Sequence, residues 1–136
     1  MTAINAILVV ILAWSTPAGV LVDEGHKFGA NIVESPLQPF LSSLADEHAR
    51  EVCNGATPHD NFLDRARRAG RGEISEIVAR SWPDRTLREG AAEAWKDWKT
   101  SRSHWRTANG RPKAYGAALR QDKRGRWVAV IIASWE

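Results

Sequence analysis

Histidine side chains are the residues of this sequence with the clearest capacity for chemistry, because a neutral imidazole can ligate a metal or accept a proton near neutral pH. The chain has four, at His26, His48, His59 and His104. His48 lies on the apolar face of a predicted helix, which indicates a hydrogen-bonded core residue, and His26 lies in a charged segment without periodicity. His59 precedes a predicted helix and His104 begins another, so both fit a cleft as well as an exposed surface.

One carboxylate stands out because its neighbours are apolar. Glu76 lies within the stretch ISEIVA, and strand alternation places it on the same face as Ile74 and Val78. A buried carboxylate is unfavourable unless a partner compensates its charge. Two interpretations stay open: a partnered group inside the fold, or a group at a sheet edge that reaches water.

The elements that must position these side chains follow from periodicity and end signals. An amphipathic helix begins near Pro39 and stops at Gly55, and a capping-box pattern starts another helix at Thr86. Further segments are predicted as a short helix over 60–70, a strand over 73–82, a short helix from Ser101 or Ser103 to Asn109, and a hairpin over 114–135. Trp95 and Trp98 fall on the buried stripe of the helix that begins at Thr86. This order predicts an α+β layered domain.

The first 22 residues contain no charged side chain. The apolar run followed by Pro17, Ala18 and Gly19 predicts a signal peptide cleaved after Ala18, and an uncleaved amino-terminal anchor is the alternative. Both place the folded part in an extracytoplasmic space, and a buried amino-terminal helix or strand is a third interpretation. Residues 23–38 are predicted as a linker and residues 39–136 as the domain. The single Cys53 excludes an intramolecular disulfide, so stability must come from packing.

Net charge points to partners. The formal charge is +3 and the isoelectric point about 9.4, with basic clusters at Arg65–Arg71 and Arg120–Arg126. The tryptophans fall on apolar stripes rather than on a basic face, which argues against nucleic acid. The clusters fit either a solvated surface or peripheral contact with an anionic membrane or wall polymer.

The order of several short motifs resembles the CAP superfamily (the cysteine-rich secretory, antigen 5 and pathogenesis-related 1 proteins) in its short, cysteine-poor bacterial form. The resemblance spans residues 40–135. A histidine before a Phe-x-x-Arg segment, a glutamate-containing strand, a Trp-x-x-Ser-x-x-His spacing and a glycine-containing hairpin correspond to His59–Phe62–Arg65–Gly70, Glu76, Trp98–Ser101–His104 and Tyr115–Gly116. Ile77 departs from the family asparagine, and SRSH replaces Ser-Pro-Gly-His.

The resemblance implies an α-β-α sandwich, with a small antiparallel sheet between helical layers, and a cavity lined by His59, Glu76 and His104. Two imidazoles and a carboxylate are the ligand type of an open zinc site, so zinc is the implied metal. The family is mostly non-enzymatic, so the leading expectation is a protein that binds a small molecule, lipid or cell-wall component. A metal-dependent hydrolase of peptide or wall substrates, purely structural coupling of the three residues, and a basic interaction surface beside a vestigial cavity are the alternatives.

Overall fold

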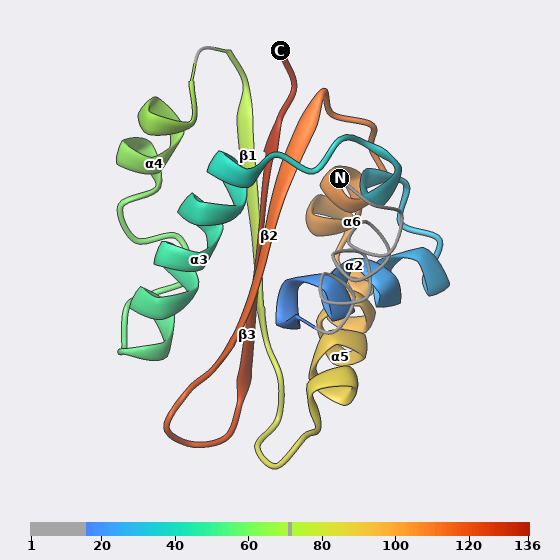
Figure 1. The fold of residues 1–136 in the computed structure, drawn as a ribbon, viewed down its shortest axis with the longest axis vertical. Helices are drawn as coiled ribbons and strands as arrows, with labels where there is room; N and C mark the ends of the chain where they lie inside the picture. The colour runs from blue at the N-terminus through green and yellow to red at the C-terminus, as the bar shows by residue number, and fades with distance from the viewer. Residues whose placement is uncertain (1–15, 71) are drawn as a thin grey trace, which may run out of the picture.

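Three layers make up residues 16–70 and 72–136, the part of the chain that the computed structural model describes (Figure 1). The elements are α2 (Pro17–Lys27), the 3-10 helix η1 (Asn31–Glu34), α3 (Pro39–Cys53), α4 (Phe62–Ala69), β1 (Ile74–Arg80), α5 (Leu87–Thr100), α6 (Arg102–Ala108), β2 (Ala114–Gln121) and β3 (Trp127–Ser134). Helices α3 and α4 cover one face of the sheet, and α2, α5 and α6 cover the other (Figure 1). The predicted α+β class and the α-β-α sandwich are confirmed.

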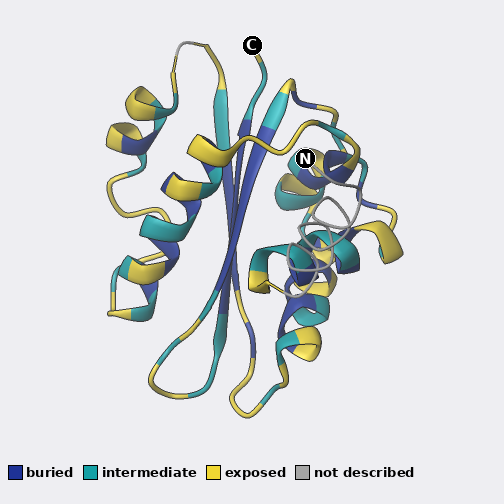
Figure 2. Cartoon of the chain, in the orientation of Figure 1, coloured by how far each residue is buried: buried dark blue, intermediate teal, exposed yellow. Residues whose placement is uncertain are grey.

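The sheet is antiparallel in the order β1-β3-β2, so β3 is the central strand. Each residue of β3 from Val128 to Ala133 is buried, as the dark strand centres in Figure 2 show. Neighbouring residues of a strand point to opposite faces. In β1, Ile77 and Ala79 therefore pack with α2, α5 and α6, whereas Val78 packs with α3. The sheet thus separates two apolar clusters.

Local signals place most of the elements where the sequence predicts them. Pro39 occupies the first turn of α3, where its missing N–H costs nothing. Thr86 and Glu89 form a capping box at the start of α5, each side chain accepting a hydrogen bond from the other residue's backbone N–H. The turn between β2 and β3 places Gly125 at a positive φ of 78°.

The predicted linker is a packed part of the domain. Residues 17–27 form α2, with Thr16 as its N-cap, and residues 31–34 form η1. Leu21 and Ile32 are wholly buried in the same cluster as the sheet. Glu24 is also buried, where Arg88 neutralises it at 2.8 Å. The domain therefore includes residues that the sequence assigns to a leader and a linker.

The remainder of the predicted leader, residues 1–15, lies outside the described residues. Among the described helices, none is both long and apolar enough to cross a membrane. Cleavage after Ala18 stays a prediction, and it would remove the capping residue Thr16 and the first two residues of α2, Pro17 and Ala18.

Helix α2 is held by the tryptophans of α5. Trp95 and Trp98 are wholly buried and pack edge to face, with ring centroids 4.9 Å apart, so their predicted place in the core is confirmed. The Trp95 indole N–H donates to the Leu21 carbonyl at 2.8 Å. A Cβ on Gly25 would lie 2.7 Å from the Trp95 ring, so the absence of a side chain lets the two helices approach.

On the other face, the backbone of α3 packs directly against Gly116 of β2. A Cβ atom at this position would collide with the backbone of Leu41 and Ser42. The Ser42 hydroxyl accepts a hydrogen bond from the Ala117 N–H at 3.2 Å. Direct packing of backbone on backbone therefore sets the height of α3 above the sheet.

If α2 is part of the core, shortening Leu21 must cost as much as a core substitution. We expect Leu21→Ala to lower the free energy of unfolding by about 2–5 kcal/mol, because it removes buried methyl groups and leaves a cavity. Leu37→Ala is the control, since Leu37 is half exposed, and we expect a change below about 1 kcal/mol. Urea denaturation measures both; equally small losses would contradict the packing of α2.

Candidate functional site

A buried ion pair forms the base of the candidate site. The Glu76 side chain is 1% exposed and the Arg65 side chain 3% exposed. The Arg65 guanidinium donates from Nε to Oε2 of Glu76 at 2.7 Å and from Nη2 to Oε1 at 2.8 Å. This two-pronged geometry is the strong form of the arginine–carboxylate contact. Glu76 is therefore partnered inside the fold and does not reach water, although β1 is an edge strand.

Two histidines flank the same carboxylate oxygen. His48, on α3, is wholly buried, with Nε2 3.5 Å from Glu76 Oε1 and also hydrogen-bonded to the Pro58 carbonyl. This confirms the predicted hydrogen-bonded core histidine. His59 Nδ1 lies 3.2 Å from Oε1, and its side chain is 52% exposed. The arrangement thus presents one imidazole to solvent above a fully buried charge pair.

The loop that carries His59 is fastened on both sides of this residue. His48 binds the carbonyl of Pro58, and Arg65 Nη1 donates to the carbonyl of Asp60 at 2.5 Å. Asn61 then adopts a left-handed conformation, with φ of 57°, directly before α4 begins. Two buried side chains therefore hold the backbone around His59, which restricts where its ring can lie.

The exposed side of His59 borders a shallow cavity of about 410 Å³. Its other lining residues come from the start of α4 and the residue before it: Asn61, Phe62, Leu63, Asp64 and Arg67. If Nδ1–H donates to Glu76, the His59 Nε2 is left as an acceptor. None of these lining residues carries a hydroxyl or thiol nucleophile. The geometry therefore suits hydrogen bonding to a bound molecule.

His104 does not join His59 and Glu76. It lies half-buried on α6, and Thr107 of the same helix donates to the Ser75 hydroxyl at 3.4 Å. Ser75 precedes Glu76 in β1, so its side chain points to the opposite face of the sheet. The imidazole Nδ1 of His104 is buried without a hydrogen-bond partner in the described part of the chain. The sequence cannot show which face α6 covers.

The residues present therefore do not fit the predicted zinc site of His59, Glu76 and His104. Both Glu76 oxygens are engaged by Arg65, and His104 approaches from the other face. Within residues 16–70 and 72–136, no group of three His, Cys, Asp or Glu side chains is arranged to hold a metal ion. What the structure does assemble is a His–Glu–Arg cluster with a second, buried histidine.

Comparisons with known proteins support the fold. No protein-family model matches the chain, and a search of curated proteins finds no match. The chain is similar to a solved structure, the Schistosoma mansoni venom allergen-like protein 4 (SmVAL4), with a TM-score of 0.58 and 12% sequence identity over 90% of each chain. That protein belongs to the CAP family. The chain therefore has a CAP-like fold.

Breaking the buried pair has a measurable consequence for stability. We expect Glu76→Gln to lower the free energy of unfolding by about 3–5 kcal/mol, because it leaves the Arg65 charge buried and uncompensated. The double variant Arg65→Met, Glu76→Leu should recover much of this loss, because it removes both buried charges and fills their space with apolar side chains. Chemical denaturation measures both.

Glu47→Gln serves as the control, since it removes an exposed carboxylate that also pairs with an arginine, Arg68. It should leave the denaturation midpoint nearly unchanged. A double variant no more stable than Glu76→Gln would show that the uncompensated charge is not the cause of the loss.

Proposed function

We propose that this CAP-like protein binds a small polyhydroxylated ligand, such as a cell-wall glycan, in the cavity beside His59. The observation that carries the proposal is the exposed imidazole of His59, held at Nδ1 by the buried Glu76 carboxylate. An ordinary solvated histidine has no such anchor. Holding the ring in advance lowers the conformational entropy lost when a ligand binds.

The cavity lining supports this ligand chemistry. His59 Nε2 and the Asp64 carboxylate accept hydrogen bonds, and Asn61 and Arg67 donate them. Phe62 and Leu63 contribute apolar surface, and Leu63 is 74% exposed. A sugar presents hydroxyl groups around its ring edge and C–H groups on its face, so it can use both parts of this lining.

A binding role fits the site better than a catalytic one. Glu76 is compensated by Arg65, so its charge is used within the fold. The cavity offers acceptors and donors around one oriented imidazole, without an adjacent nucleophile among the residues that line it. Residues 1–15, which precede the packed helix α2, contain no charged side chain, and this composition supports a location outside the cytoplasm, where wall polymers occur.

Binding of wall glycans can be measured by sedimentation with insoluble peptidoglycan and by NMR titration with soluble muropeptides. We expect His59→Ala to weaken binding by about threefold or more, the effect of removing one hydrogen bond. Chemical shifts of Asn61, Phe62 and Asp64 should respond to the soluble ligand in the unmodified protein.

His26→Ala is the matched control. His26 is also exposed and also lies beside a glutamate, with Nδ1 3.4 Å from Oε1 of Glu34, but it is on α2, across the sheet from His59. We expect its binding to equal that of the unmodified protein. Equal weakening in both variants, or no shift in residues 59–67, would overturn the proposal.

A further inference from the structure

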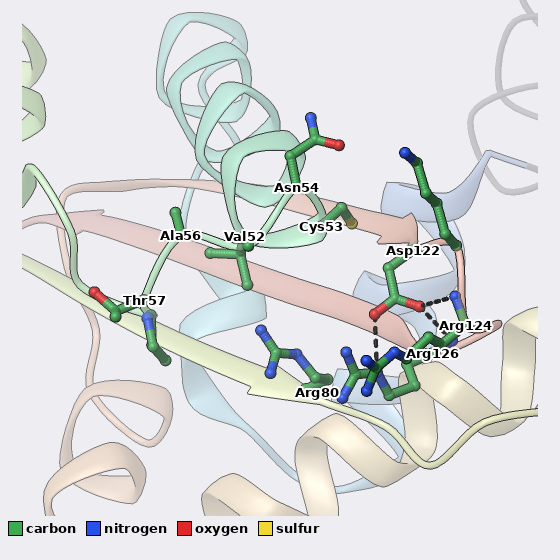
Figure 3. A pocket seen from close by; sticks show the side chains of 12 residues that line it. Val52, Cys53, Asn54, Ala56, Thr57, Arg80, Asp122, Arg124 and Arg126 are labelled. Carbon is green, nitrogen blue, oxygen red and sulfur yellow. Dashed lines mark hydrogen bonds and ion pairs between the residues drawn. The ribbon is translucent and has the colours of Figure 1, made fainter.

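A second cavity, of about 600 Å³, opens between the end of α3 and the turn that joins β2 to β3. Its walls are the residues around the end of α3, the last residue of β1, and the turn: residues 52–58, Arg80, Asp122, Lys123, Arg124 and Arg126. Figure 3 shows Arg80, Arg124 and Arg126 on one side of the opening and Asn54 on the other. The cavity does not include His59.

The charge of this lining is strongly unbalanced. Four of its side chains are cationic and one, Asp122, is acidic. Asp122 pairs with Arg126, whose Nε donates to Oδ2 at 2.9 Å. No ion pair or hydrogen bond within the described residues occupies the side chains of Arg80, Lys123 or Arg124. Three positive charges therefore line one opening without a carboxylate partner.

The turn holds its arginines in place. The Asp122 carboxylate accepts hydrogen bonds from the backbone N–H groups of Arg124 and Arg126, both at 2.9 Å. Burial raises the pKa of Asp122, but the hydrogen bonds from Arg126 and Arg124 outweigh this and leave the pKa below its usual value. The Asp122 side chain is only 4% exposed. The single carboxylate of the cavity is thus committed to the turn.

The opposite wall contributes neutral hydrogen-bond donors and one feature that disfavours an anion, the C-terminal end of α3. The Asn54 amide and the Thr57 hydroxyl line the cavity and have no side-chain partner among the described residues. The negative end of α3 also faces this region and acts against an anion with about half a charge. Its last carbonyls already accept from the N–H groups of Asn54, Gly55 and Ala56. Three unpaired cations outweigh it.

We propose that this cavity binds a phosphate group. Arginine favours phosphate because its planar guanidinium can donate two parallel hydrogen bonds to the phosphate oxygens. The volume lies within the range of small-molecule sites. The phosphate can belong to a soluble compound or to a lipid head group. Both would present negatively charged phosphate oxygens to Arg80 and Arg124.

Titration calorimetry with inorganic pyrophosphate tests the proposal on the whole chain. We expect saturable binding, with affinity reduced at least about tenfold in Arg80→Gln, Arg124→Gln, because each substitution removes charged hydrogen bonds. The charge-matched control is Arg102→Gln, Arg111→Gln, which removes two exposed cations without ion pairs in the described part of the chain. It should bind as the unmodified protein does.

Vesicles distinguish the two sources of phosphate. Sedimentation with phosphatidylglycerol vesicles, against phosphatidylcholine vesicles, shows whether the head group of an anionic lipid is captured. The proposal is supported if Arg80→Gln, Arg124→Gln loses binding of pyrophosphate or of phosphatidylglycerol vesicles while the charge-matched control keeps it. The probe that is lost identifies the source of the phosphate. Equal loss in the charge-matched control, or no binding of either probe, overturns the proposal.

The single Cys53 gives an independent measure of location. Its side chain lines the cavity, and burial raises the pKa of its thiol. We expect saturating pyrophosphate to slow alkylation of Cys53 by iodoacetamide severalfold. An unchanged rate under saturation would place the bound anion elsewhere. If Arg80→Gln, Arg124→Gln still binds muropeptides, the cationic cavity and the cavity beside His59 act independently.

Discussion

The burial of one carboxylate constrains the whole α3–α4 side of the molecule. Glu76 lies in an apolar strand and is closed off from water, where an unpaired charge would cost several kcal/mol. Arg65 supplies the compensating charge, and this requires α4 to lie against β1. His48 contacts Glu76 from α3. The loop between α3 and α4 lies over the Glu76–Arg65 pair, because His48 and Arg65 bind its backbone carbonyls. The exposed position of His59 is a product of this arrangement.

The sequence was sufficient to predict those helices and turns whose ends are marked by local signals. The capping box at Thr86, the proline at the start of α3 and the turn before Trp127 act over a few residues, so they can be read without knowledge of the fold. The same holds for the strand alternation that set Glu76 on the face of Val78.

The sequence was insufficient where a long-range contact decides the outcome. An uncharged run such as residues 1–22 has the composition of a leader and also that of a buried helix. Long-range contacts distinguish the two for α2, among them the hydrogen bond from Trp95 to the Leu21 carbonyl and the ion pair between Arg88 and Glu24. The resemblance to the CAP superfamily grouped His104 with His59, but the order of the motifs along the chain does not state which face of the sheet α6 covers. Likewise, the basic run 120–126 does not reveal that Arg120 pairs with Asp46 while Arg80, from another strand, completes the cationic cavity.

Gly116 links the two sites mechanically. Because α3 rests on the sheet through backbone atoms at this point, no side chain there can yield to absorb a change in spacing. The same helix carries His48, which holds the loop of His59, and its end forms a wall of the phosphate cavity. A side chain at residue 116 would tilt or lift α3 as a rigid body. A substitution at this position would therefore change the cavity beside His59 and the phosphate cavity together, although it is remote from both.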